Sequence, residues 1–172
     1  MAEQVSVDTH RDGRADFDFL IGAWDSRQRK LKHILKGCDE WEEFHAVSVA
    51  RKILGGLGNF DEVTLEKPGG HVLGATLRLF DPQTQLWRIY WSSSSRTVLD
   101  PPMVGRFEQG RGEFYDQELF EGRPVFSRFI WTSSGADACH WEQAFSADGG
   151  RTWETNWTMD LTRRKDTNVA EE

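Results

Sequence analysis

The chain has little of what membrane-spanning, disulfide-rich and zinc-binding proteins depend on. Only two of its 172 residues are cysteine, Cys38 and Cys139, and neither belongs to a CxxC pair or to a ligand spacing suited to zinc. No stretch approaches the roughly 20 consecutive apolar residues of a membrane-spanning helix, and residues 1–16 are polar rather than signal-like. We therefore expect free thiols in a reducing, cytoplasmic compartment, with no membrane partner and no metal.

Positive charge is also in short supply. The chain has 21 Lys and Arg residues against 28 Asp and Glu residues, which gives a formal net charge of -7. Basic residues gather only at Arg27–Lys32 and Arg163–Lys165. A nucleic-acid-binding surface needs a basic patch or stripe, so we expect no nucleic-acid partner.

Aromatic residues, in contrast, are abundant. Eight tryptophans and eleven phenylalanines occur in this short chain. Such a composition suits packed β structure and the lining of a ligand cavity equally well. Composition alone therefore leaves two interpretations open, tryptophan as core filler and tryptophan as a ligand-binding surface.

The order of residues predicts an all-β domain. Short runs rich in aromatic and β-branched residues alternate with clusters of Gly, Pro, Asp and Ser, which is the spacing of a barrel or sandwich. Phe17, Leu20 and Ile21 have helical spacing and predict one short helical turn. We expect a single domain over residues 1–165 and a charged, disordered tail over residues 166–172. The predicted strands are Trp24–Leu31, Glu40–Ile53, Phe60–Glu66, His71–Phe80, Leu86–Ser92, Met103–Gln109, Glu113–Phe120, Val125–Thr132, Ala138–Phe145 and Trp153–Thr162.

The hairpins predict which face of each strand is buried, because side chains alternate faces along a strand. Around the Asp81-Pro82-Gln83-Thr84 turn, pairing Leu79 with Trp87 brings apolar residues together on one face. The opposite face carries Arg78 against Arg88, and we expect it to lie outside, in solvent. Near the end of the chain, Trp141 is predicted opposite Trp157. Several consecutive hairpins agree on one buried face, as an up-and-down antiparallel barrel requires. A two-sheet sandwich shows the same alternation and stays an alternative.

One turn has a recognisable sequence. Residues Ser146–Trp153 match the S-x-D-x-G-x-T-W pattern called an Asp box, which repeats in sialidase propellers but occurs once here. Its chemistry is that of a hairpin, with Asp148 accepting backbone N–H bonds and the glycines at positive φ. We interpret it as structural.

The two ends of the domain carry a family resemblance. Gly22-Ala23-Trp24, between the helical turn and the first strand, is the G-x-W that opens lipocalins and related calycin barrels. In calycins an arginine after the last strand packs over that tryptophan, and Arg163 or Arg164 stands at the matching place. Residues Phe17–Trp24 together with Ser146–Trp157 are similar to uncharacterised bacterial lipocalin-like proteins, over nearly the whole domain. The resemblance implies a barrel of about ten strands and no established activity.

Haem is a minority alternative that follows from the same resemblance. Haem-binding relatives of nitrobindin share the general architecture, and in them a histidine binds the iron axially. The five histidines of this chain, at positions 10, 33, 45, 71 and 140, lie on different segments without a shared motif. None matches that ligand, so no cofactor is assigned.

A polar band is predicted inside the barrel. Turns at Gly110-Arg111 and Gly122-Arg123 bring Asp116 and Glu118 to the inner face and place Glu118 opposite Ser127. The next ladders add Gln143 and Thr155, so that one interior rung is polar. A buried carboxyl must be hydrogen-bonded or kept protonated at a raised pKa, and either state is useful chemically. A slip of one residue in the second turn would face both acids outward.

The leading hypothesis is a barrel that binds a small apolar or aromatic molecule. The chief alternative is an enzyme, for example an isomerase, decarboxylase or cyclase, that uses buried carboxyls for proton transfer. A protein-interaction module and a homodimer are also left open. The predicted catalytic residues are Glu118 and Asp116, and the predicted ligand-binding residues are Trp91, Ser127, Trp141, Gln143, Thr155 and Trp157.

Overall fold

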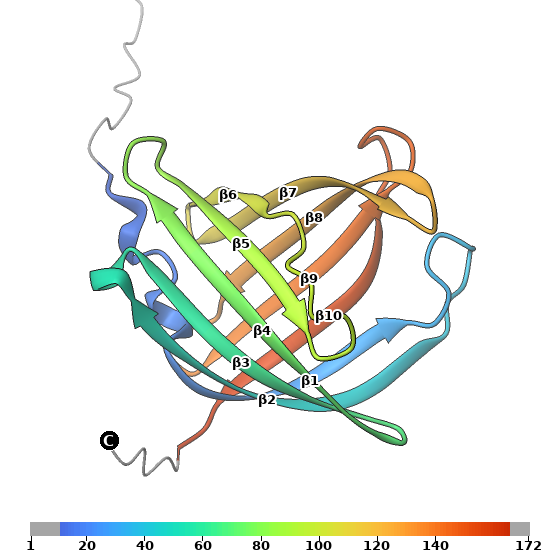
Figure 1. Cartoon of the computed structure of the whole chain (residues 1–172), viewed down its shortest axis with the longest axis horizontal. Helices are drawn as coiled ribbons and strands as arrows, with labels where there is room; N and C mark the ends of the chain where they lie inside the picture. Colours follow the sequence, from blue (N-terminus) through green and yellow to red (C-terminus); the bar gives the residue numbers. More distant parts are fainter. Residues whose placement is uncertain (1–10, 166–172) are drawn as a thin grey trace, which may run out of the picture.

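The chain forms a closed barrel of antiparallel strands in a computed structural model that describes residues 11–165 (Figure 1). Around the barrel the strand order is β1-β10-β9-β8-β7-β6-β5-β4-β3-β2, so each strand pairs with its neighbours in the chain and β1 closes on β10. All ten predicted strands are confirmed, whereas the tail predicted to be disordered lies outside the described residues. The strands are β1 (Gly22–Leu31), β2 (Trp41–Ile53), β3 (Gly58–Lys67), β4 (Gly70–Asp81), β5 (Leu86–Ser93), β6 (Met103–Glu108), β7 (Arg111–Phe120), β8 (Arg123–Ser133), β9 (Ala138–Ser146) and β10 (Glu154–Arg163).

Closure of the sheet explains why so much of the chain can be strand without free edges. Helical structure among the described residues is confined to three short 3-10 turns, η1 (Gly13–Ala15), η2 (Asp18–Leu20) and η3 (Leu54–Gly56). No helix within residues 11–165 has the length and apolar character needed to cross a bilayer. Because β1 pairs with β10 and closes the sheet, the predicted barrel is confirmed and the sandwich alternative is wrong.

The pairing predicted between β4 and β5 is wrong by one residue. Phe80 lies opposite Trp87, and Arg78 lies opposite Ile89. The reason is the turn, in which the Asp81 carboxylate accepts from the Gln83 amide at 2.9 Å. The loop contains four residues, Pro82–Gln85, one more than the predicted pairing leaves between the strands. Because a shift of one residue exchanges the two faces of a strand, Arg78 lies inside the barrel instead of in solvent.

Two later turns also differ from the prediction, with a milder effect. The loops are Gln109-Gly110 and Glu121-Gly122, one residue earlier than expected, and both residues of each loop have φ between 49° and 79°. This is the type I′ geometry that suits two-residue hairpins. Moving such a loop by one residue shifts the register by two, which preserves the faces. Asp116, rather than Glu118, is thus opposite Ser127, and both acids still face inward.

The last hairpins show the same kind of shift. Trp141 lies opposite Met159 and not opposite the predicted Trp157, while Gln143 lies opposite Phe129 in the preceding strand. In both pairs the register differs from the prediction by two residues, so the aromatic side chains still face the interior.

A β-bulge in β10 changes one predicted site residue. The register shifts between Thr155 and Trp157, so that Asn156 is the extra residue. Thr155 pairs with Ala144, on the outward-facing positions, and Trp157 pairs with Gln143. The predicted pairing of Gln143 with Thr155 is therefore wrong, because the bulge turns the threonine away from the interior.

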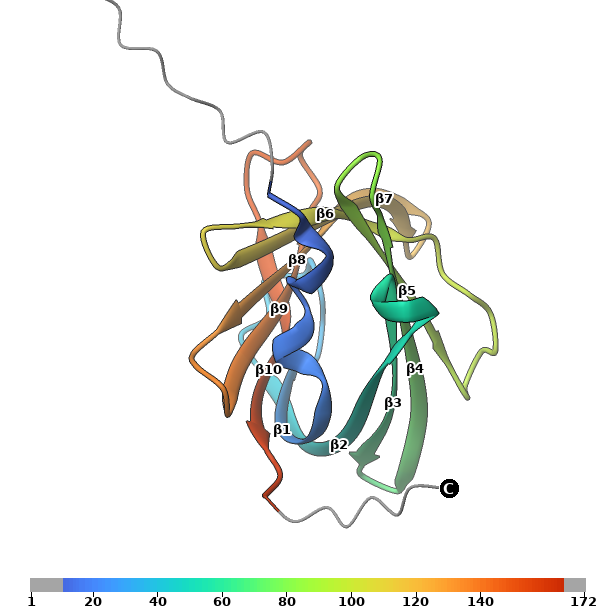
Figure 2. The same cartoon turned by 90° about the vertical axis from the view of Figure 1, so that its left-hand side faces the viewer.

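The turns η1 and η2 close one end of the barrel, the end that Figure 2 faces. Trp24 is fully buried there, and the Arg163 guanidinium lies 4.3 Å from the centre of its ring. Arg163 also donates to the backbone oxygens of Phe19 and Ile21, at 2.8 and 2.6 Å. Gly22 has a φ of 120°, which other residues rarely adopt, and a Cβ there would lie 2.5 Å from the Arg163 Nη1 atom and displace the guanidinium. The calycin arrangement is thus present, with Arg163 as its arginine.

The Asp-box turn lies at the opposite end, between β9 and β10. Asp148 accepts from the amides of Arg151 and Thr152, and Gly149 and Gly150 have positive φ. Hydrogen bonds, chiefly from the Thr152 hydroxyl and amide, lower the pKa of Asp148 to about 2. The structural interpretation of this motif agrees with these contacts.

Replacing Trp24 by alanine tests the closed end. Loss of a fully buried tryptophan should reduce the free energy of unfolding by about 3–5 kcal/mol, measured by urea denaturation. As a control, Leu119→Ala at a side chain 70% exposed should change it by less than about 0.5 kcal/mol. A Trp24→Ala variant that unfolds like wild type would contradict the proposed role of the Trp24–Arg163 contact.

Candidate functional site

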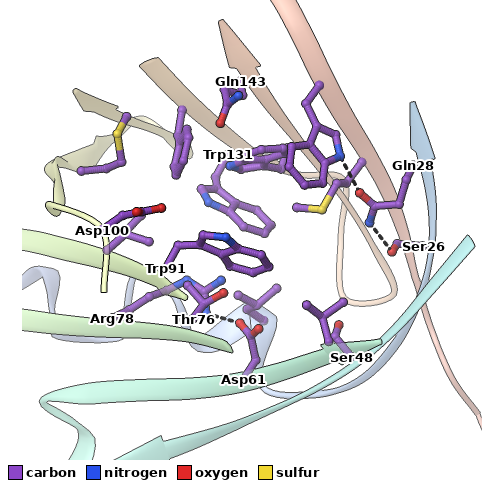
Figure 3. Close-up of a pocket in the computed structure, with 18 of the residues that line it drawn as sticks. Ser26, Gln28, Ser48, Asp61, Thr76, Arg78, Trp91, Asp100, Trp131 and Gln143 are labelled. Atoms are coloured by element: carbon purple, nitrogen blue, oxygen red, sulfur yellow. Dashed lines mark hydrogen bonds and ion pairs between the residues drawn. The ribbon is translucent and has the colours of Figure 1, made fainter. Parts of the chain in front are cut away.

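The barrel encloses a cavity of about 280 Å³, near the lower end of the range for small-molecule pockets (Figure 3). All ten strands contribute to it, together with η2 and the segment between β5 and β6. Of the predicted site residues, six line it: Trp91, Asp116, Glu118, Trp141, Gln143 and Trp157. Ser127 is fully buried behind this lining, and Thr155 does not reach it.

Four tryptophans form the aromatic part of the wall. Trp91, Trp131, Trp141 and Trp157 all line the cavity, of which Trp131 was not predicted. Trp141 meets Trp157 edge to face, with ring centres 5.9 Å apart and an interplanar angle of 83°. The Trp157 Nε1–H donates to Gln28 Oε1 at 2.8 Å, which fixes the orientation of that ring. Much of the wall is therefore rigid and aromatic.

Trp91 is positioned by a glycine. Gly74 lies on the neighbouring strand β4, and a Cβ added there would lie 2.1 Å from the Trp91 ring. Any other residue would have to displace the indole. The ring therefore packs directly on the backbone of β4, next to Thr76 and Asp100 in Figure 3.

The predicted polar rung is not one rung but two separate pairs. On β7 and β8, the Ser127 hydroxyl donates to the Glu118 carboxylate. On β9 and β10, Gln143 Nε2 donates to Asn156 Oδ1 at 2.8 Å. The pairs are separate because the registers of β8 and β9 differ from the prediction by two residues.

A buried ionic cluster is the main feature that the sequence did not predict. Arg78 is only 4% exposed, and its Nη1 atom donates to Asp61 Oδ2 at 2.5 Å and to Asn59 Oδ1 at 3.0 Å. The guanidinium also lies 5.4 Å from the Phe17 ring centre and 5.6 Å from that of Trp131. The sequence did contain a warning that the register was wrong, because the predicted pairing placed two like charges, Arg78 and Arg88, opposite each other.

The barrel wall is incomplete beside β6. The ladder between β5 and β6 covers only Trp87–Ile89, and the ladder between β6 and β7 ends at Tyr115. The segment 94–102 crosses this place, held to β5 by the Asp100 amide, which donates to the Trp91 oxygen at 2.9 Å (Figure 1). Pro101 and Glu118 are exposed and also line the cavity. The cavity therefore reaches the surface here, and we call this opening the entrance.

Glu118 stands at the entrance with an altered acidity. Its carboxyl is accessible to water but surrounded by protein atoms, and burial is the largest cause that raises its pKa. The hydrogen bond from Ser127 opposes this effect, and the nearby charges of Asp116 and Asp100 add to it. The raised pKa brings the group closer to the range in which it exchanges a proton at neutral pH.

The lining offers little to a metal or to haem iron. No histidine within residues 11–165 lines the cavity, and this part of the chain contains no group of three or more His, Cys, Asp or Glu residues arranged for a metal ion. The Cys139 thiol is buried, which raises its pKa to about 12. The haem alternative thus finds no axial histidine in the lining.

Comparison with known proteins identifies the fold and no family. No protein-family model matches the chain, and no curated protein matches its sequence. Among solved structures, an S-type phycobiliprotein lyase, CPES from Guillardia theta, superposes with a TM-score of 0.62. The match covers 96% of this chain and 100% of that chain, at 10% sequence identity. The two proteins share the barrel fold, and at this identity the likeness establishes the fold alone.

Glu118→Gln tests the raised pKa through stability. Since the folded state favours the protonated carboxyl, ionising Glu118 costs stability as pH rises from its ordinary pKa to the raised one, and the cost persists at neutral pH. The glutamine variant should therefore have a higher Tm than wild type at pH 7. The difference should vanish below about pH 4, where both states of wild type bind the proton. A variant less stable than wild type at pH 7 would contradict the assignment.

The Arg78–Asp61 pair can be tested by a double-mutant cycle. Arg78→Met leaves a buried carboxylate without its partner and should cost about 3–5 kcal/mol. The double variant with Asp61→Leu should recover most of that loss, because no buried charge remains. Arg27→Met, in the exposed pair with Glu43, serves as the control and should change stability by less than about 1 kcal/mol. Additive losses in the cycle would mean that the two buried residues are not coupled.

Proposed function

We propose that this barrel binds a small, largely aromatic molecule in its cavity. The observation that carries the proposal is the combination of four tryptophans and several inward-facing polar groups around one cavity that reaches the surface. A cavity of mostly apolar walls with few fixed polar groups is the usual form of a small-molecule site. The finer assignment, to the uncharacterised bacterial lipocalin-like proteins, stays an inference from the Phe17–Trp24 and Ser146–Trp157 segments.

The size of the expected affinity follows from the aromatic surface. Burying a ring removes roughly 150–250 Å² of apolar surface from water, which contributes roughly 4–6 kcal/mol at about 25 cal/mol per Å². Association costs an estimated 4–15 kcal/mol of lost freedom, so stacking alone gives weak binding. Polar anchors must supply the rest, and Gln143, which lines the cavity and is held by its hydrogen bond to Asn156, is one such group.

The structural neighbour adds modest support. That protein is a lyase of phycobiliproteins, so a barrel of this fold serves a chemical function there. Nothing about its substrate is carried to this chain. The likeness is consistent with a ligand-binding interior and with catalysis in that interior.

Proton transfer is the second candidate function. It is favoured by one observation, the raised pKa of Glu118 beside Asp116 at the entrance. A protonated Glu118 could donate to a bound molecule while Asp116 accepts, as in an isomerase, decarboxylase or cyclase. Turnover of a bound compound by wild type, and its loss in Glu118→Gln, would distinguish this function from binding alone.

A ligand screen tests the binding proposal. We expect native mass spectrometry of the full chain with a library of small aromatic compounds to detect one-to-one complexes. Gly74→Ala should weaken them at least fivefold, since its Cβ displaces the Trp91 ring, and Gln143→Leu should weaken them by a similar factor. Glu62→Gln, which changes an exposed acid of β3 that does not line the cavity, is the matched control. Unchanged binding in both folded cavity variants would exclude the cavity as the site.

A further inference from the structure

The charged groups of the cavity lining do not balance. Five ionisable side chains line it, of which four are acids and one is an arginine: Asp61, Asp100, Asp116, Glu118 and Arg78. Asp61 is paired with Arg78, and Asp100 is paired with Arg96 outside the lining. Neither Asp116 nor Glu118 forms an ion pair within the part of the chain that the structure describes. Arg96, the partner of Asp100, lies close enough for its charge to lower the pKa of Glu118, but burial has the larger effect and raises it. The lining therefore has two acids without an ion-pair partner of their own.

These two acids lie where a ligand enters. They are at consecutive inward positions of β7, just beyond the end of its ladder with β6. Asp100 lies on the other side of the entrance, close enough for its charge to raise the pKa of Glu118. The Asp100 amide donates to the Trp91 oxygen, and both side chains line the cavity, so carboxylates and an aromatic ring are part of the same wall (Figure 3). A positive group on a ligand is stabilised by both.

The inner part of the lining has the opposite character. Arg78 is almost completely buried, and its two hydrogen bonds to side chains both come from Nη1. Its Nε–H is buried without any acceptor, which is costly for a charged group. Nη2 donates to no protein acceptor within residues 11–165. The guanidinium thus has donor capacity that the surrounding residues leave unused, on the wall of the cavity.

Arg78 and the β7 acids lie on different strands but at about the same level of the barrel. Arg78 is opposite Ile89, and Ile89 is opposite Met103. The next residue of β6, Val104, is opposite Tyr115, the neighbour of Asp116. Arg78 and Asp116 therefore stand near one level of the barrel, three strand spacings apart, which is roughly 14 Å along the curved wall. The straight path across the interior is shorter.

We propose that the cavity selects an aromatic molecule with a cationic nitrogen at the entrance and an oxygen acceptor at its inner end. The nitrogen is recognised by Asp116 and Glu118, and the oxygen, as in a carbonyl, accepts from Arg78. This inference rests on the proposed binding function and specifies the ligand class. An anionic ligand is disfavoured, because it would add negative charge to a lining with surplus acid.

Two lysines, Lys30 and Lys67, lie close to aromatic rings of the barrel but do not change the net charge of the cavity lining. Lys30 lies over the Trp157 ring at 4.4 Å, and Lys67 lies over the Phe44 ring at 4.7 Å and pairs with Glu42. Neither lysine lines the cavity. Lys30 is in β1 and Lys67 is in β3, on the side of the barrel opposite the β7 acids in the strand order.

Four indole compounds separate the parts of the proposal. Isothermal titration calorimetry of the full chain at pH 7.5 compares tryptamine, which is cationic, tryptophol, its neutral analogue, and indole-3-acetate, which is anionic. The fourth probe, 5-carboxamidotryptamine, adds a carbonyl at the far end of the ring. We expect tryptamine to bind at least tenfold more tightly than tryptophol, indole-3-acetate to bind most weakly, and the carboxamide to improve on tryptamine about fivefold.

Variants assign the two effects to residues. The double variant Asp116→Asn/Glu118→Gln should abolish the preference for tryptamine over tryptophol while tryptophol binds as before. Glu62→Gln, the exposed acid of β3, should leave every affinity unchanged. Arg78→Lys should remove the advantage of the carboxamide and keep the preference for the cation. If Arg78→Lys does not fold, the comparison of tryptamine with its carboxamide on wild type tests the inner pole by itself.

The outcomes are distinguishable. Equal affinities for tryptamine and tryptophol, or tighter binding of indole-3-acetate, would overturn the cationic end and leave the binding function intact. A carboxamide that binds no better than tryptamine would overturn the inner end. If none of the four probes binds while the aromatic library does, the ligand class is wrong. Failure of the library and the probes together would overturn the proposed function itself.

Discussion

The pairing of the first strand with the last is the constraint on which the rest of this molecule depends. β1 and β10 form seven ladder pairs, from Trp24 with Arg163 to Lys30 with Trp157. Without that seam the chain is an open, strongly curved sheet with two long unpaired edges. Its inner face would then lose its shape as a cavity. Arg163 reinforces the seam at one end, because it lies over the Trp24 ring and binds the carbonyls of the preceding turn.

Much of this architecture could be predicted from the sequence because it follows from alternation and from turn residues. All ten strands, the inward faces of β7, β8 and β9, and the packing of Arg163 on Trp24 agree with expectations drawn from the chain alone. An error of one residue in placing a two-residue turn shifts the register by two, and such a shift does not change which side chains face inward. The acids of β7 therefore stayed on the correct face although their partners changed.

The errors have a common physical origin. An apolar pattern cannot count the residues in a loop whose length is set by a side-chain hydrogen bond, as at Asp81, and it cannot locate a bulge such as the one at Asn156. The first error placed Arg78 in solvent, and the second placed Thr155 in the cavity. Burial of an arginine also contradicts the rule that charges stay outside, and it is tolerated here because Asp61 and Asn59 lie within hydrogen-bonding distance. Local pattern could not reveal that compensation, which comes from another strand.

The short ladder of β6 determines where the barrel opens locally. Hydrogen exchange in a barrel is slow where each strand has two partners, and faster where a segment is held by few bonds. Beside β6, the segment 94–102 is held by a few backbone hydrogen bonds in place of a continuous ladder. The Asp100 amide donates to the Trp91 oxygen, and the amides of Arg96 and Thr97 donate to the Ser93 oxygen. Local opening at this point costs far less than separating β1 from β10. Molecules can therefore exchange with the interior on the timescale of a loop, while the remaining strands keep the slow exchange of a globally stable fold.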